Sequence, residues 1–188
     1  MDGDGRDDYL SFAPNGQVRA WLNTGQFPNW TSLGVIAFGV GANGANVRFA
    51  DVNCDGFADY LVIANKSITQ YLNLGVSSFP KWGNGTVVFT NDALTSSTIR
   101  LADLNGDGCA DYLLVDPTSG ATQAGLNDRK GGSISLGTIA GRVSSSGASI
   151  VFADINGDGF ADFASVGSGG SIHAFSTKVR PLFTHRTT

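Results

Sequence analysis

The sequence contains no glutamate: all 16 acidic residues among its 188 are aspartate. It also has no run of about 18 apolar residues, which a membrane-spanning helix requires. The net charge is −4, and the 12 basic residues are scattered rather than clustered. Because binding to nucleic acid phosphates relies on clustered Lys and Arg, the composition argues against nucleic acid as a partner and against insertion into a membrane.

Recognisable catalytic motifs are also missing. The chain has no Gly-x-Ser-x-Gly, no His-Glu-x-x-His and no cysteine paired with a histidine at a familiar spacing. Of its two histidines, His173 falls in a predicted strand and His185 in the C-terminal tail. We therefore expect the chain itself not to be an enzyme.

Cysteine is scarce, with Cys54 and Cys109 as the two examples. They lie in neighbouring copies of a repeated acidic loop, at different positions within it. A disulfide requires Cα atoms within about 7 Å of each other, which the sequence does not establish. The interpretation that we favour is two free thiols filling loop positions, with a disulfide as the alternative.

The aspartates that are present concentrate in a loop that recurs every 51 or 52 residues. Each complete copy has Asp at positions 1, 5 and 9, Asn at position 3 and Gly at position 6. A fourth copy opens the chain without its first position, and the four copies use 12 of the 16 aspartates. The candidate ligands in chain order are Asp2, Asp4 and Asp8; Asp51, Asn53, Asp55 and Asp59; Asp103, Asn105, Asp107 and Asp111; and Asp154, Asn156, Asp158 and Asp162.

This loop has the oxygen-rich chemistry of a calcium site. Calcium takes six to eight oxygen ligands, and a tight turn lets one short segment supply most of them. An EF-hand is excluded because it needs a Glu at position 12, whereas Val62, Leu114 and Ser165 occupy that position within strand patterns. The Asn at position 3 limits the charge to −3 per complete loop, which fits a moderate-affinity extracellular site.

The rest of each repeat is predicted to form a β-propeller blade. A short strand precedes the loop, an apolar strand follows it, and a turn leads to a third strand and a looser fourth one. Four short strands repeated every 50 residues or so are typical of propellers, and no stretch has helical periodicity. The expected fold is all-β with about 3.7 repeats: a partial blade over 1–46, blades over 47–98 and 99–149, a partial blade over 150–176 and an irregular tail over 177–188.

Two sets of aromatic residues recur in this pattern. Trp21, Tyr71 and Phe175 share one column of the third strand, and we interpret them as core between blades rather than as a binding platform. Trp30 and Trp82 each follow a Phe-Pro-x segment, at a spacing of 52 residues. An exposed Trp can stack on a sugar ring, but we favour a structural role for both over a glycan-binding one.

The loop, read as D-x-N-x-D-G-x-x-D-Y/F before an apolar strand, resembles the FG-GAP/VCBS repeat. So does the segment from Phe38 to Ala42, with its Phe-Gly and Gly-Ala pairs. Similar repeats form integrin α-subunit propellers, fungal propeller lectins and modules attached to secreted fungal hydrolases. The resemblance implies a propeller of about seven blades with Ca²⁺ in these loops, each ion also bound by a backbone carbonyl at position 7: Arg6, Phe57, Cys109 or Phe160.

From these features we expect a non-catalytic, calcium-binding module that is secreted and recognises a glycan or a protein. The alternative is a structural accessory domain of a secreted hydrolase whose catalytic domain lies outside this chain; an orphan fragment with no function of its own is a third interpretation. Since the chain begins inside a loop, we expect it to be part of a longer repeat array. A homodimer that completes a propeller is a further expectation.

Overall fold

The computed structural model describes residues 1–26, 28–76, 80–130, 132–142 and 149–177. The chain divides into two compact units, residues 1–96 and 97–188. The described residues form antiparallel strands with one short 3₁₀ helix, η1 (Gly44–Asn46), and no α-helix. They contain no helix that is long and apolar enough to cross a membrane. The prediction of an all-β chain without a substantial helix is confirmed.

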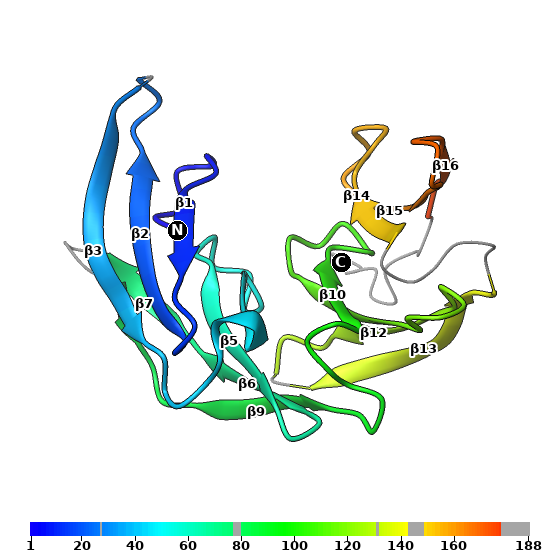
Figure 1. Ribbon diagram of the computed structural model, residues 1–188, viewed down its shortest axis with the longest axis horizontal. Helices are drawn as coiled ribbons and strands as arrows, with labels where there is room; N and C mark the ends of the chain where they lie inside the picture. The colour runs from blue at the N-terminus through cyan, green and yellow to red at the C-terminus, as the bar shows by residue number, and fades with distance from the viewer. Residues whose placement is uncertain (27, 77–79, 131, 143–148, 178–188) are drawn as a thin grey trace, which may run out of the picture. The chain divides into compact units, whose positions relative to one another are not determined.

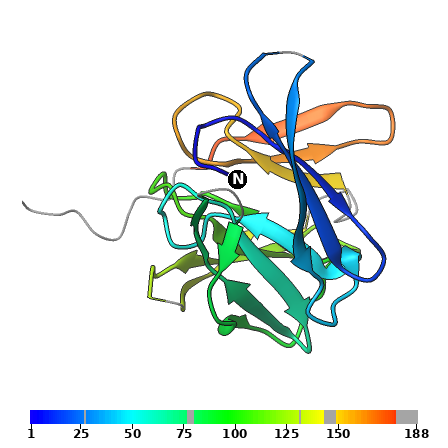
Figure 2. The ribbon, with the colours of Figure 1, turned by 90° about the vertical axis from the view of Figure 1, so that its left-hand side faces the viewer.

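The first unit contains two larger sheets and one hairpin (Figures 1 and 2). The first sheet has the order β1-β2-β3, and the second has the order β4-β5-β6-β9. Strands β7 and β8 pair with each other as a separate hairpin. The bounds are β1 (Tyr9–Phe12), β2 (Gln17–Asn23), β3 (Trp30–Phe38), β4 (Val47–Ala50), β5 (Asp59–Ala64), β6 (Ser67–Tyr71), β7 (Asn73–Val76), β8 (Pro80–Trp82) and β9 (Thr86–Thr90).

The second unit also has two sheets. One has four strands in the order β10-β11-β12-β13, and the other has three described strands in the order β14-β15-β16. The bounds are β10 (Ile99–Ala102), β11 (Asp111–Val115), β12 (Thr122–Asn127), β13 (Ser133–Ala140), β14 (Ile150–Ala153), β15 (Asp162–Val166) and β16 (Ile172–Phe175). Thus two of the four blades have the predicted four strands; the tail that follows β16 lies largely outside the described residues.

Sequence alternation explains how each blade packs. The strand after each loop is buried on both sides, as in Tyr60, Leu61, Val62 and Ile63 of β5. Within each unit one blade packs a face against the other blade, because a single blade cannot bury its apolar faces alone. In the first unit, Val18, Ala20 and Ile36 form one core cluster with Tyr60 and Val62, among others.

The second blade contains a hairpin that the sequence analysis did not predict. The third strand, β6, already ends at Tyr71, and the chain forms the β7–β8 hairpin before the fourth strand, β9. Gly83 and Gly85 separate β8 from β9, and glycine weakens a continuous strand. A Cβ at Gly85 would lie 2.8 Å from the Tyr71 ring, so this close approach requires glycine.

Candidate metal centre

Each complete acidic loop connects the first two strands of a blade: β4 to β5, β10 to β11, and β14 to β15. The residue at position 9, which is Asp59, Asp111 or Asp162, is the first residue of the second strand. The sheet therefore fixes one end of every loop, and the remaining eight positions form a turn outside the sheet.

The aspartate at position 1 holds this turn together. Asp51 Oδ1 accepts a hydrogen bond from the Cys54 backbone N–H at 2.6 Å, and Oδ2 accepts one from Gly56 at 2.8 Å. Asp103 and Asp154 make the same two contacts with the glycines at positions 4 and 6 of their loops, at 2.7–2.9 Å. The loop is thus folded by its own candidate ligands.

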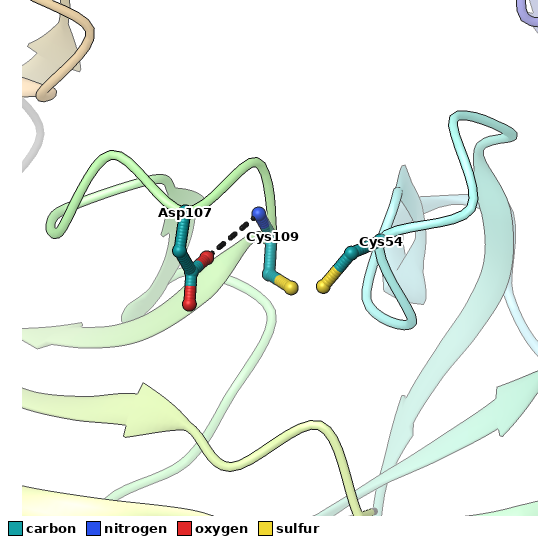
Figure 3. Close-up of side chains that lie close together, drawn as sticks. All are labelled: Cys54, Asp107 and Cys109. Carbon is teal, nitrogen blue, oxygen red and sulfur yellow. Dashed lines mark hydrogen bonds between the residues drawn. The ribbon is translucent and has the colours of Figure 1, made fainter. Parts of the chain in front are cut away.

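Positions 3 and 5 form short Asx turns in the same way. Asp55 Oδ1 accepts a hydrogen bond from the Phe57 N–H at 2.9 Å, and Asp107 Oδ1 accepts one from the Cys109 N–H at 2.9 Å (Figure 3). Asp158 makes the matching contact at 3.1 Å. Because each of these side chains accepts a nearby N–H, its oxygen is held beside the turn rather than free in solvent.

Glycine at position 6 is required by the backbone. Gly56, Gly108 and Gly159 have φ values of 86°, 83° and 87°, a region that costs an L-residue about 1–2 kcal/mol. Position 4 is left-handed as well, and there the second blade places Cys54 with φ 63° where the other loops have glycine. Two left-handed residues in one turn let the chain reverse tightly between positions 1 and 9.

The aspartate at position 9 has a second task that the sequence did not reveal. Asp59 is fully buried; its Oδ2 accepts the Val52 N–H at 3.2 Å and its Oδ1 accepts the Asn73 N–H at 2.8 Å. Asp111 repeats this with Leu104 and Asn127. Position 9 therefore ties the loop to the end of the third strand.

A recurring Leu-Asn pair, at the end of the third strand or directly after it, was the available signal for this contact. Asn23, Asn73 and Asn127 each donate their backbone N–H to the position-9 aspartate of their own blade at 2.8 Å. In the fourth blade Thr177 does so at 3.0 Å. The amide groups of Asn73 and Asn127 also donate to the carbonyls of Ala58 and Ala110, which anchors the strand end twice.

Burial affects the charge of two of these carboxyls. Desolvation raises the pKa of Asp59 and that of Asp111 to about 6. Hydrogen bonds from backbone N–H groups oppose this increase in both cases, whereas the neighbouring carboxylates of the same loop add to it. The like charges that raise these pKa values are the groups that a bound cation would compensate.

The donor chemistry of the loops fits a hard cation. Every candidate side chain presents oxygen, and an oxygen that accepts one N–H keeps a second lone pair for a metal. Among the described residues, no single loop brings one oxygen from each of three carboxylates within 4.8 Å of one another. A cation held by positions 1, 3, 5 and 9 would thus have to draw these oxygens together.

At two of the four loops an arginine already pairs with a candidate ligand. In the incomplete first loop, the guanidinium of Arg6 pairs with Asp4. In the third loop, Arg129 Nη2 lies 3.1 Å from Asp107 Oδ2. A metal ion would have to compete with these groups, so the loops that begin at Asp51 and Asp154 are the better candidates.

The other predicted site residues lie apart from these loops. Trp82 packs against the core of the first unit and donates its indole N–H to the Ile36 carbonyl at 2.6 Å, which is the structural role that we favoured. Trp30 is 46% exposed on β3. Phe27 and Phe79, which open the two Phe-Pro-x segments, lie outside the described residues. His173 is exposed on β16, and His185 is likewise not described.

The cysteines depart from the favoured interpretation. Both are disulfide-bonded, and neither is a free thiol. Cys109 is fully buried at the candidate carbonyl position of its loop. The expectation of free thiols is therefore wrong, because the spacing of the cysteines along the sequence carried no information on their separation in space.

Solved structures with a similar fold include a toxin and a lectin. The pore form of the Photorhabdus luminescens Tc holotoxin aligns with a TM-score of 0.62 and 23% identity, over 90% of this chain and 8% of that one. A lectin from Agrocybe aegerita that recognises non-reducing terminal N-acetylglucosamine aligns with a TM-score of 0.62 and 20% identity, over 94% and 47%. The chain thus spans less than half the length of either protein.

No curated protein sequence matches the chain. A family model described as the FG-GAP-like repeat matches three times, at residues 1–62, 55–114 and 103–165. These matches contain all four acidic loops and most of the described strands. The predicted propeller-type repeat is confirmed, and the chain belongs to the FG-GAP-like repeat family.

Proposed function

We propose that this chain is a non-catalytic, calcium-binding module of the β-propeller type that recognises a glycan or a protein outside the cell. The observation that carries the calcium assignment is the repetition of one loop design. Asp51, Asp103 and Asp154 each fold their loop through the same pair of N–H contacts. Every complete copy therefore has the same turn, with three carboxylates and one amide as candidate ligands.

Calcium would supply two positive charges to a turn that otherwise has three negative ones. The chain's own residues provide the remaining support. The position-1 aspartates hold the turn, the glycines at position 6 permit its reversal, and the position-9 aspartates connect it to the third strand. Since each loop joins two strands of a thin blade, an ion bound there would stabilise the blade that carries it.

Recognition rather than catalysis is proposed on two grounds. First, the aspartates at position 1 accept hydrogen bonds that fold their own loops, and both histidines lie outside these loops, so neither forms an acid–base pair with a loop aspartate in the sequence pattern. One protein of similar fold is a lectin for terminal N-acetylglucosamine, which makes a glycan the ligand class to test first. A structural accessory role beside a hydrolase is the alternative, and it predicts no ligand for the isolated chain.

Thermal unfolding with calcium or with excess chelator tests the metal assignment. At a calcium concentration of about 100 Kd, one site stabilises the folded state by about 2.7 kcal/mol. We expect the melting temperature to rise with calcium and the increase to shrink in Asp55→Asn and Asp158→Asn. Asp92→Asn is the matched control, because Asp92 is an exposed carboxylate outside the loops that pairs with Lys66.

A glycan array that includes terminal N-acetylglucosamine tests the recognition assignment. Calcium-dependent binding by the isolated chain would support it. If the array is silent while calcium still raises the melting temperature, the module binds the metal but not a glycan, and the protein ligand or the accessory role remains. An unchanged melting temperature would contradict the calcium proposal itself.

A further inference from the structure

Three asparagines of the first unit lie in the pattern that N-linked glycosylation requires, Asn-x-Ser/Thr without proline in the middle. The three segments are Asn29-Trp-Thr31, Asn65-Lys-Ser67 and Asn84-Gly-Thr86, and residues 97–188 contain no such sequence. In a chain with 13 asparagines the pattern also arises by chance. Its meaning therefore depends on the environment of each asparagine.

The asparagines in the pattern differ from the others by side chains that take no part in the fold. All three are exposed, and none forms a side-chain hydrogen bond with another residue that the structure describes. Outside the pattern, every asparagine except Asn46 folds a turn, because its Oδ1 accepts the N–H two residues further along at 2.8–3.2 Å. These residues are Asn15, Asn23, Asn43, Asn53, Asn73, Asn91, Asn105, Asn127 and Asn156. A glycan is bulky and polar, so an exposed asparagine without such a contact accepts it without disturbing the fold.

Asn84 is the best placed of the three. It lies between β8 and β9, and the neighbouring Gly83 and Gly85 approach Leu72 and the Tyr71 ring closely. The two glycines hold this segment against the blade, whereas the residue between them is exposed. Asn84 does not have a positive φ, so the backbone gives no reason for an asparagine here.

Asn65 lies at the tip of the two-residue turn that joins β5 to β6. Asn65 and Lys66 have φ values of 51° and 60°, as in a type I′ turn, which favours asparagine. This position therefore has a structural reason as well, but its side chain is exposed in the turn. Asn29 is left out of the assignment, because the bulky Trp30 directly follows the group that would have to react.

Asn84 and Asn65 flank the outer edge of the second blade. Strand β9 is the last in the order β4-β5-β6-β9, and among the described strands it pairs with β6 alone (Figure 1). Asn84 lies two residues before β9 begins. At the other end, the carbonyl of Lys66, next to Asn65, accepts the N–H of Asn91 directly after β9 at 3.0 Å. An open edge of this kind is where a strand of another chain pairs.

We propose that Asn84 and Asn65 carry N-linked glycans, which cover the β9 edge from its two ends. In the reaction the asparagine Nδ2 attacks the anomeric carbon of an oligosaccharide that is linked to a lipid diphosphate. A carbon–nitrogen bond forms, the bond from that carbon to the diphosphate oxygen breaks, the lipid diphosphate leaves, and the amide proton passes to a base of the transferase. The assignment rests on the proposed location outside the cell, because this transferase acts in the secretory pathway.

Intact-mass measurement tests the proposal on the full chain, produced in a eukaryotic cell behind a cleavable signal sequence and recovered from the secretory pathway and the medium. We expect added mass that peptide N-glycosidase removes. Asn84→Gln and Asn65→Gln should each reduce this mass by one glycan. Asn46→Gln is the matched control, because Asn46 has no side-chain hydrogen bond to a described residue but lies outside the pattern; it should change nothing.

Substitution of the hydroxyl residue is a sharper test, because the asparagine stays in place. Thr86→Val should abolish the glycan at Asn84, and Ser67→Ala the one at Asn65, whereas Ser67→Thr preserves the pattern and should keep it. Thr86→Val also separates glycosylation from the spontaneous loss of ammonia at Asn84-Gly85. That loss ends in aspartate, as glycosidase treatment does, but it does not need Thr86.

Enzymatic removal of the glycans from the folded protein tests the covering role. We expect light scattering on warming to increase, because the β9 edge is then open to other chains. The double variant Asn65→Gln with Asn84→Gln is the control, and the same treatment should not change its scattering. Unchanged scattering of the treated wild-type protein would contradict the covering role.

Chains recovered from the secretory pathway with no glycan at either position would overturn the proposal, and so would a glycan at Asn84 that persists in Thr86→Val. A glycan at one position alone would overturn the assignment of the other. The melting temperature with and without calcium is measured on the same material. A chain without glycans that calcium still stabilises would contradict the glycosylation and leave the calcium assignment standing.

Discussion

The buried aspartate at position 9 offers the clearest test of how these loops are built. Replacing Asp59 by Ala removes the acceptor for two backbone N–H groups, those of Val52 and Asn73, at 3.2 and 2.8 Å. Asp55, at position 5 of the same loop, instead accepts an exposed N–H from Phe57. Asp55→Ala is therefore the matched control for the removal of one loop carboxylate.

The two substitutions should lower the free energy of unfolding by different amounts. Water can replace Asp55 as the acceptor for the exposed N–H of Phe57, but it cannot reach the buried N–H groups at Asp59. A buried donor left without a partner costs about 1–3 kcal/mol, so the two N–H groups at Asp59 sum to about 2–6 kcal/mol. Alanine also removes a buried charge, and the free energy gained in this way offsets part of that cost. We expect a net loss of about 2–3 kcal/mol. The exposed N–H at Phe57 can bind water after Asp55→Ala, and its loss should cost less than about 1 kcal/mol.

Urea unfolding monitored by Trp fluorescence measures this difference. All three Trp residues lie in the first unit, together with Asp59, so the signal reports on that unit alone. The experiment is done in excess chelator, which separates the hydrogen bonds from any metal effect. A loss from Asp59→Ala no greater than that from Asp55→Ala would refute the role that we assign to position 9.

Three further predictions follow from single contacts. Arg129→Gln should tighten calcium binding at the third loop about two- to fivefold, because an exposed ion pair is worth at most about 1 kcal/mol; calorimetric titration measures this, with Lys130→Gln as a control that changes nothing. Trp82→Phe should cost about 1 kcal/mol in urea unfolding, because the Ile36 carbonyl loses its donor. Gly56→Ala should cost about 1–2 kcal/mol, from its φ of 86° alone, since nothing lies within 4 Å of the added Cβ. An unchanged unfolding midpoint in Trp82→Phe would contradict the hydrogen bond to Ile36, and one in Gly56→Ala would contradict the requirement for glycine at position 6.

The parts of the fold that depend on short-range sequence were predictable. Position 1 folds its own loop through N–H groups three and five residues ahead, and position 6 needs glycine for its left-handed backbone. Both requirements recur every 51 or 52 residues. The loop pattern therefore predicts each turn, the strand that follows it and the length of the repeat. Alternation of apolar residues then gives most of the remaining strands.

Features that depend on contacts between blades could not be predicted in the same way. The role of Trp82 is decided by the Ile36 carbonyl, 46 residues earlier, and by the aliphatic residues of the preceding blade. Trp30 has the same local sequence context and register, yet it is exposed. Identical local patterns therefore lead to different environments, because burial is determined by what packs against the blade.

The second task of position 9 was hidden for a related reason. Asp59 reads as a metal ligand in the loop, whereas its partner Asn73 lies 14 residues further along and donates a backbone group. The recurring Leu-Asn pair marks the position of the donor, but nothing in it identifies the aspartate that accepts the backbone N–H. The cysteines show the same limit, since no pattern of neighbouring residues distinguishes the bonded Cys54 and Cys109 from free thiols.

The most direct test of the account is to count the calcium ions bound to the native chain. Native mass spectrometry after exchange into calcium should detect tightly bound ions at the two loops beginning at Asp51 and Asp154, with a weaker third at Asp103. Asp55→Asn and Asp158→Asn should each remove one of the tight ions, and magnesium should not replace them. A chain that retains no calcium, or one whose bound calcium is unaffected by both substitutions, would contradict the assignment of these loops as its metal centres.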